Sequence, residues 1–315
     1  MPQTSKWREK HILGLEYLSA AEITTILDLA DEYRPAATDT STKLDVLSGK
    51  TVLNFFMEPS TRTAISFGLA AGRCGATVVN FSKASSSTQK GETLIDTARN
   101  IEAMGVDVIV IRHSAAGAPQ MLAKNTNCAI VNAGDGRHEH PTQGLLDLLT
   151  IRQAKGAIKG LKVAIVGDIA NSRVARSNLW GLRKLGAEVT FIGPPTMLSK
   201  SMEQWGARVL YDFDECIGEF DVINMLRIQL ERQTDAAIPS LREYSALFAL
   251  TPERLTRTKD DCLVMHPGPI NRGVELPSSV ADCDRSAILP QVSNGVAVRM
   301  AVLTLVSRAR DAQAN

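Results

Sequence analysis

Short runs of consecutive apolar residues recur along the first half of the chain, and longer mixed segments separate them. The runs are rich in Val, Ile and Phe, which predicts buried strands; they are residues 51–56, 76–81, 106–111 and 128–132. The segments between them, about 63–74, 92–104 and 117–125, are predicted to be helices. Strands of this kind that alternate with helices predict a parallel sheet covered on both faces.

The same alternation begins again near Gly160. We predict strands at residues 161–166, 188–192, 208–211, 221–225 and 262–265, with a helix at 172–185 among their connections. This repetition predicts a second α/β domain. We therefore expect two domains, residues 1–142 with 293–315 and residues 143–292, each a parallel β-sheet flanked by helices.

Further helices and loops complete the pattern. Ser19 can cap a helix that runs to about Tyr33, and another helix is predicted at 144–154. A strongly apolar helix at about 296–309 follows Ser293-Asn294-Gly295, and we expect it to return to the first domain. Residues 34–46 and 229–250 are predicted to be loops.

The charge balance bears on which partners the protein binds. Lys plus Arg is 35 and Asp plus Glu is 34, which argues against a binder of duplex nucleic acid or of a membrane surface. No uninterrupted apolar run approaches the ~20 residues that span a bilayer, and the N-terminus lacks a hydrophobic signal core. The five cysteines form no C-x-x-C pair, so we predict buried free thiols in a reducing cytoplasm.

Polar residues follow the first set of strands at their carboxyl ends, where open α/β sheets bind ligands. The first strand leads into Ser60-Thr61-Arg62-Thr63, with Ser60 as the predicted helix N-cap, and the third strand ends near Arg112. The first turn of a helix has N–H groups without partners and the positive end of the dipole, which favours an anion. A capped surface helix with a solvated arginine remains the alternative for this stretch alone.

Two further polar stretches follow strands of the first domain. The hydroxyl-rich residues 82–91 are either a flexible surface loop or a mobile lid that carries Lys90 onto an anion. His138-Glu139-His140 suggests a metal site, but no third ligand stands at helical spacing and H-E-x-x-H is absent. We predict no metal and interpret His140 as a neutral imidazole that polarises a carbonyl, with Gln143 one helical turn further on.

The second domain offers cations at its own strand ends. Its first strand leads into residues 167–173, which lack G-x-G-x-x-G, so no nucleotide cofactor is predicted. Arg173 follows Asn171 and Ser172, either of which can cap the next helix. Other strand ends supply Arg227 with Gln229, and His266-Pro267-Gly268-Pro269. Guanidinium groups suit the forks of phosphate and carboxylate, which predicts a polyanionic substrate set.

These motifs resemble those of the carbamoyltransferase family. Residues 56–63, Phe-Met-Glu-Pro-Ser-Thr-Arg-Thr, resemble its F-x-E-x-S-T-R-T signature, and His140-Pro141-Thr142-Gln143 is similar to its second signature. Lys90-Gly91-Glu92, Arg227-x-Gln229-x-Glu231-Arg232 and residues 266–269 look like the aspartate-specific branch. The H-C-L-P of the ornithine branch is absent. The resemblance runs along nearly the whole chain in the same order.

The resemblance implies a reaction of carbamoyl phosphate with L-aspartate that gives N-carbamoyl-L-aspartate and phosphate, the committed step of pyrimidine synthesis. The amine attacks directly, without a covalent enzyme intermediate or a cofactor. The family also implies a homotrimer with shared active sites, into which Ser86 and Lys90 of a neighbour reach; Ser85 and Ser87 remain alternatives to Ser86. Whether a regulatory chain or a dihydroorotase binds the trimer stays open.

The resemblance also implies roles for single residues. The phosphate lies on the turn that ends at Thr63, and the carbamoyl oxygen is polarised by Thr63, Arg112 and His140. The implied carbamoyl-phosphate ligands are Ser60, Thr61, Arg62, Thr63, Ser86, Arg112, His140, Gln143 and the backbone at Pro267, Gly268 and Pro269. The implied aspartate ligands are Lys90, Arg173, Arg227 and Gln229. A carbamoyltransferase for another amino acid such as ornithine, or an idle paralogue that binds phosphorylated metabolites, remains an alternative.

Overall fold

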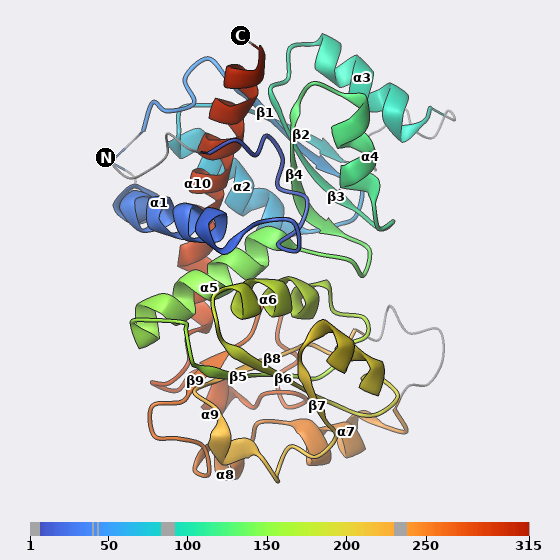
Figure 1. Cartoon of the computed structure of the whole chain (residues 1–315), viewed down its shortest axis with the longest axis vertical. Coiled ribbons are helices and arrows are strands. Elements are labelled where there is room, and N and C mark those ends of the chain that lie inside the picture. Colours follow the sequence, from blue (N-terminus) through green and yellow to red (C-terminus); the bar gives the residue numbers. More distant parts are fainter. Residues whose placement is uncertain (1–6, 40, 43, 83–91, 230–237, 315) are drawn as a thin grey trace. The chain divides into compact units, whose positions relative to one another are not determined.

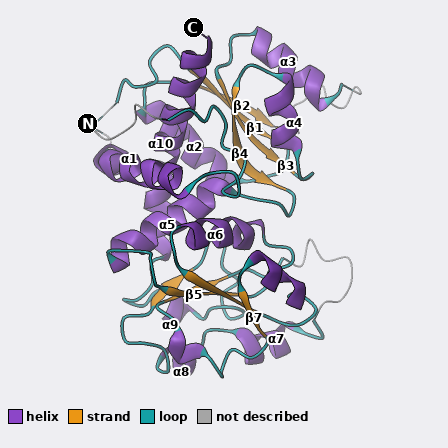
Figure 2. Ribbon diagram, viewed as in Figure 1, coloured by secondary structure: helices purple, strands orange, loops and turns teal. Residues whose placement is uncertain are grey.

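The computed structural model describes residues 7–39, 41–42, 44–82, 92–229 and 238–314. By its internal contacts the chain divides into two compact units, Met1–Leu146 with Ser293–Asn315 (unit 1) and Asp147–Val292 (unit 2). Each unit holds one wholly parallel sheet with helices against it (Figure 2). The predicted α/β class with two parallel sheets is therefore confirmed.

The sheet of unit 1 has the strand order β2-β1-β3-β4. Its strands are β1 (Thr51–Phe56), β2 (Thr77–Ser82), β3 (Val108–His113) and β4 (Ala129–Asp135). Helices α3 (Leu94–Ala103) and α4 (Ala118–Asn125) cover one face, and α1 (Ala20–Thr38), α2 (Thr61–Arg73) and α10 (Ile288–Ala314) lie on the other side (Figure 1). Alternate strand residues such as Phe55 and Ile109 pack with Ile101 and Leu122 of the covering helices.

The sheet of unit 2 has the order β7-β6-β5-β8-β9. Its strands are β5 (Lys162–Val166), β6 (Glu188–Ile192), β7 (Arg208–Leu210), β8 (Val222–Met225) and β9 (Leu263–Met265). The helices are α6 (Arg173–Lys184), α7 (Leu241–Phe248), α8 (Pro252–Leu255) and α9 (Ser278–Ala281), with short 3₁₀ turns η4 (Lys200–Trp205) and η5 (Ile217–Glu219). Helix α5 (Pro141–Lys155) begins in unit 1 and ends in unit 2.

Three helix predictions are corrected. Helix α1 begins after Ser19, whose hydroxyl accepts a bond from Glu22 N as predicted, but it continues to Thr38 because Ala36 and Ala37 are buried on the same face. Residues 241–248, within a predicted loop, form α7, since Ser240 caps it and its apolar residues reach the core. Helix α10 begins at Ile288 and takes in residues 293–295, which were predicted to precede it.

Helix α10 is also the one described helix that is long and apolar enough to cross a membrane, with mean hydropathy 1.3. Two thirds of that apolar window, 67%, is buried inside the fold, including Ala297, Met300 and Leu303. The core of unit 1 therefore accounts for its composition. Bilayer-spanning segments were sought among uninterrupted apolar runs. That criterion does not single out this helix because Asn294 and Arg299 interrupt its apolar sequence.

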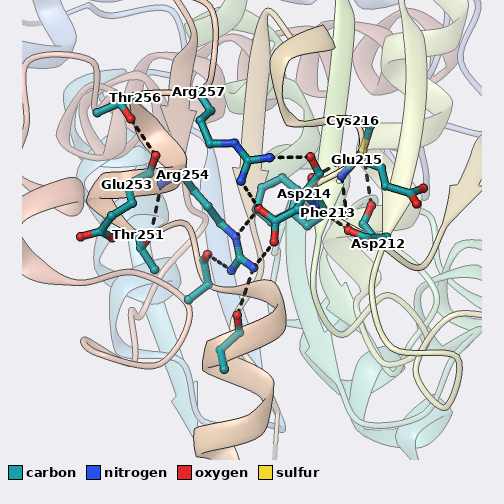
Figure 3. Close-up of polar contacts among 12 residues, drawn as sticks. Asp212, Phe213, Asp214, Glu215, Cys216, Thr251, Glu253, Arg254, Thr256 and Arg257 are labelled. Carbon is teal, nitrogen blue, oxygen red and sulfur yellow. Dashed lines mark hydrogen bonds and ion pairs between the residues drawn. The ribbon is translucent and has the colours of Figure 1, made fainter.

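A buried arginine holds the end of α7 in unit 2 (Figure 3). Arg254 donates to the carbonyl oxygens of Ala249 (2.8 Å) and Ala246 (3.0 Å), which are left without helical partners at the C-terminus of α7. The same guanidinium grips Asp214 with Nε at 3.1 Å and Nη2 at 2.6 Å. Arg254 and Arg257 outweigh the effect of partial burial and hold the pKa of the Asp214 carboxyl below its usual value.

Candidate active site

In unit 1 the chain leaves β1 toward β2 on one side and leaves β3 toward β4 on the other. The loops after β1 and β3 therefore diverge at the carboxyl ends of these two strands, which is where open α/β sheets bind ligands. The predicted anion-binding turn, 60–63, follows β1, and Arg112 lies opposite Phe56 in the sheet register. The structure therefore brings Arg112 to the same sheet edge as this turn.

The turn at the start of α2 differs from the prediction in one respect. Ser60 occupies the N-cap position, but its hydroxyl makes no capping bond to the helix. Ser60 Oγ instead donates to Thr63 Oγ1 at 2.9 Å, and Thr63 is 8% exposed. Thr61 and Arg62 are exposed. The cap position thus leaves the helix N–H groups without a hydroxyl from Ser60, which suits a turn that receives an anion.

Arg112 is held by an ion pair with Glu58, a residue to which the sequence analysis assigned no role. Arg112 Nη2 lies 2.9 Å from Glu58 Oε1, and both side chains are largely buried. Nη1 donates to Ala133 O at 3.4 Å, and the backbone oxygen of Arg112 accepts from Met57 N at 2.9 Å. These contacts fix the guanidinium beside the motif. The carboxylate inside the motif was the signal that could have identified Glu58.

His140 lies between the end of β4 and Pro141, the first residue of α5, and is 5% exposed. Its backbone oxygen accepts from Gln143 N at 2.9 Å, so Gln143 stands one helical turn further on, as predicted. The neighbouring His138 pairs with Asp135. His138 Nδ1 lies 3.1 Å from Asp135 Oδ2, and this hydrogen bond outweighs burial and raises the pKa of His138.

The donor atoms of Glu16, His138 and Glu139 lie within 4.8 Å of one another, so the described residues do hold one metal-like cluster. The contacts of Glu139 account for it otherwise. Its two carboxylate oxygens accept the backbone N–H groups of Leu15 and Glu16, at 2.8 Å and 3.1 Å. With His138 Nδ1 engaged by Asp135, both Glu139 and His138 have protein partners.

Unit 2 has its corresponding divergence between β5 and β8. Gly167 follows β5 with φ 130°, and a Cβ there would lie 3.0 Å from Leu226 O and from Tyr244 Oη, so the tight approach requires glycine. The next residue, Asp168, is fully buried. Its carboxylate accepts from the Asn171 amide at 2.9 Å and from Gln229 N at 3.4 Å. Asp168 thereby joins the turns after β5 and β8.

Of the predicted aspartate-binding residues of unit 2, Gln229 contacts this carboxylate, and Arg173 and Arg227 belong to the segments that leave β5 and β8. Ser172 caps α6, since its Oγ accepts from Ala175 N at 3.1 Å, and Arg173 in the first turn is 5% exposed. Gln229 Nε2 donates to Asn171 O at 3.2 Å, while Arg227 is half-buried two residues earlier. The structure thus brings Gln229 to the α6 turn.

The 266–269 segment follows β9 with a cis Gly268–Pro269 bond. Gly268 N donates to His266 Nδ1 at 2.8 Å, so Nδ1 is the acceptor and Nε2 carries the proton. Nε2 lies 3.2 Å from Glu275 Oε1 inside a wholly buried pair. Sequence reasoning missed Glu275 because its partner is nine residues away and no motif contains it.

The predictions for Ser86 and Lys90 lie outside the described residues. Four of the five cysteines are buried, Cys283 is half-buried and all are free, as predicted.

The chain matches two family profiles and many known proteins. Residues 10–153 match the aspartate/ornithine carbamoyltransferase carbamoyl-P binding domain, and residues 159–306 match the Asp/Orn binding domain. The catalytic subunit of aspartate carbamoyltransferase from Syntrophotalea carbinolica is 56% identical over 96% of both chains. The same subunit from Rhodopirellula baltica is 52% identical over 97% of this chain and 93% of its own.

Solved structures agree with these sequence matches. Aspartate transcarbamoylase from Trypanosoma cruzi, in complex with carbamoyl phosphate and aspartate, is similar with a TM-score of 0.86 and 32% identity, covering 96% of this chain and 98% of its own. Ornithine carbamoyltransferase from Pyrococcus furiosus is similar with a TM-score of 0.85 and 30% identity, covering 94% and 96%. The motifs, both domains and the fold agree: the chain belongs to the aspartate/ornithine carbamoyltransferase family.

Proposed function

We propose that the chain transfers the carbamoyl group of carbamoyl phosphate to L-aspartate, giving N-carbamoyl-L-aspartate and phosphate for pyrimidine synthesis in the cytoplasm. The observation that carries the proposal is the uncapped N-terminal turn of α2 beside the Glu58–Arg112 pair, in a chain whose curated relatives at 52–56% identity are named aspartate carbamoyltransferase. We assign carbamoyl phosphate to residues 1–142 with 293–315, and aspartate to residues 143–292.

The reaction proceeds by positioning and electrostatic stabilisation. The aspartate amine attacks the carbamoyl carbon, and negative charge develops on the carbonyl oxygen. Thr63, Arg112 and His140 donate to that oxygen, and one such donor lowers a barrier by about 3 kcal/mol. The C–O bond to phosphate then breaks, and the departing phosphate accepts the proton of the amine. No side chain forms a covalent bond.

The proposed ligands of each group are those that the family resemblance implies. Ser60, Thr61, Arg62 and Thr63 hold the phosphate on the α2 dipole. Gln143 and the backbone at Pro267, Gly268 and Pro269 hold the carbamoyl NH₂. Arg173, Arg227 and Gln229 bind the two carboxylates of aspartate, because planar guanidinium groups form bidentate pairs with carboxylates.

We further propose a homotrimer in which Ser86 and Lys90 serve a neighbour's site. Strand β2 is an edge strand that leads directly to residue 83, and its Val79 is 43% exposed. Ile65 and Leu69, one turn apart on α2, are also exposed large apolar side chains. Uncovered edges and grouped apolar residues suit an interface between copies. A regulatory chain and a dihydroorotase remain candidate partners of this trimer.

One assay tests the reaction: purified protein is given carbamoyl phosphate with a panel of amino acids, and carbamoylated product is measured. Aspartate should react fastest. Faster reaction of ornithine would favour the rival that the Pyrococcus furiosus structure represents, and no turnover at all would favour an idle paralogue.

Mixed oligomers test the shared site. Lys90→Ala and Arg62→Ala should each be inactive, and mixing them should restore part of the activity because some sites then receive both intact residues. Complete inactivity after proven subunit exchange would contradict sharing.

A further inference from the structure

Glu139 carries a fully buried carboxylate to which the proposed reaction gives no task. An ionised carboxylate costs several kcal/mol to bury unless hydrogen-bond donors compensate. Here the donors are two consecutive backbone N–H groups, Leu15 N at 2.8 Å from Oε2 and Glu16 N at 3.1 Å from Oε1. Each oxygen takes one of them, although 124 residues separate Leu15 from Glu139 along the chain.

The N-terminal segment is shaped to receive this carboxylate. Gly14 lies directly against it, since a Cβ at Gly14 would overlap Glu139 Oε1. The preceding backbone is bound to β4: Ile12 N donates to Ile130 O at 2.9 Å, and Asn132 N donates to Ile12 O at 2.8 Å. Asn132 Nδ2 also donates to Leu13 O at 2.9 Å. The donors for Glu139 are therefore fixed to the strand from which His140 follows.

The backbone of Glu139 is fixed as well, by the turn that leaves β4. Asp135 N donates to Glu139 O at 3.1 Å, and Glu139 N donates to Asp135 Oδ1 at 3.2 Å. Asp135 Oδ2 also accepts Gly117 N at the start of α4, at 2.8 Å. Two segments thus hold Glu139: Asp135 binds both of its backbone groups, and the N-terminal segment binds its side chain. His140 is the next residue.

We propose that Glu139 is a positioning residue, whose carboxylate ties the turn before His140 to the N-terminal segment and so aims the His140 imidazole at the carbamoyl oxygen. The inference rests on the proposed function, which gives His140 that role. Misplacement of a catalytic group by about 1 Å can lower the rate about 100-fold. The Ser60–Thr63 turn has no part in the tether, so phosphate binding should not depend on it.

The test breaks the same contact from both sides. Glu139→Gln places an amide NH₂ against a backbone N–H, and Gly14→Ala pushes the carboxylate away with a methyl group. Each variant should lower kcat about 10- to 100-fold, with the KM for aspartate and the Kd for inorganic phosphate within about twofold. The kcat of the double variant should be no lower than that of the less active single variant, because both substitutions remove the same interaction. Glu16→Gln, which removes a neighbouring charge and keeps the N–H, is the control and should match wild type.

Imidazole NMR provides a readout that does not need turnover. The chain has 5 histidines, so the His140 signals can be assigned by their loss in His140→Asn. These signals should shift in Glu139→Gln and Gly14→Ala and stay in place in Glu16→Gln. Unchanged signals and unchanged kcat in the folded variants would refute the tether, and so would a Kd for phosphate that rises as much as kcat falls. A wild type without aspartate turnover would refute the proposed function instead, and the NMR result would still decide the tether.

Discussion

The two units place their candidate residues at equivalent points of similar sheets, yet prepare them differently. In unit 1 the cap residue Ser60 turns its hydroxyl to Thr63 and gives no capping bond to α2. In unit 2 the cap residue Ser172 bonds to Ala175 N and closes the start of α6. The first turn of α2 thus receives no bond from its cap residue. The first turn of α6 is capped and carries the side chain of Arg173.

The carboxylates at the carboxyl ends of the two sheets also have different partners. Glu58 of unit 1 pairs with the guanidinium of Arg112. Asp168 of unit 2 is buried and joins two turns through Asn171 and Gln229. We infer that unit 1 is built to receive a phosphate on backbone N–H groups, whereas unit 2 preassembles side chains for carboxylates.

The largest effect is expected when one arginine of each unit, Arg112 or Arg227, is replaced by methionine. Arg112→Met should lower kcat about 100- to 1,000-fold, because a donor to the developing oxyanion is lost. Arg227→Met should instead raise the KM for aspartate and leave the Kd for phosphate within about twofold. Steady-state kinetics with calorimetric phosphate titration separates the two. Similar defects in both variants would break the division of labour.

The scaffold of unit 2 should depend strongly on Arg254. Arg254→Met leaves Asp214 and the carbonyls at the end of α7 without that donor, and should lower the free energy of unfolding by about 2–3 kcal/mol. Arg272→Met is the matched control, since Arg272 and Asp282 form an exposed pair 2.7 Å apart and such pairs contribute at most about 1 kcal/mol. Urea unfolding measures both. Equal losses would show that Arg254 stabilises unit 2 no more than an exposed ion pair does.

The two cap serines should respond in opposite ways. Ser172→Ala should lower the unfolding free energy by about 1–2 kcal/mol, because a working cap is lost. Ser60→Ala should change it by less than about 0.5 kcal/mol and weaken phosphate binding instead. A stability loss in Ser60→Ala as large as in Ser172→Ala would mean that both serines are structural caps.

The smallest expected effect is the contribution of His11, in unit 1, to the pH dependence of stability. Burial, with Lys10 nearby, lowers the pKa of His11 to about 4, and Nδ1 accepts Ile130 N. Protonation then favours the unfolded chain, so stability should fall as pH drops from about 6.5 toward 4, by about 1 kcal/mol after allowing for partial exposure.

His11→Asn keeps an acceptor near that N–H and cannot titrate. The difference between the two unfolding curves across this pH range isolates the His11 contribution from that of His138, whose raised pKa acts in the opposite direction. Parallel curves would contradict the expectation.

Strands that are buried runs with apolar residues on both faces are predicted well, so β1 and β6 have the predicted bounds. Helix limits are less predictable. Residues 293–295 resemble a break, but the packing of α10 overrides their low helix propensity. Helix α7 is short and its burial rests on Tyr244 and Phe248, so little periodicity shows in the sequence.

The candidate site shows the same limit. Residues that would touch substrate lie at strand ends or shortly after them, so Arg112 and Gln229 could be found from the chain order. Asp168 and Glu139 act through partners 61 and 124 residues away, and no local pattern encodes such a pairing. What the sequence cannot supply is therefore the set of residues that hold the others in place.

The buried thiols have a practical consequence. Burial raises the pKa of Cys74 to about 12 and those of Cys128, Cys216 and Cys262 to about 11, so the reactive thiolate is scarce at neutral pH. Cys283 alone is half-buried. The native chain therefore offers a thiol-specific fluorophore a single preferred position in unit 2, and spectroscopic labelling needs no prior removal of cysteines.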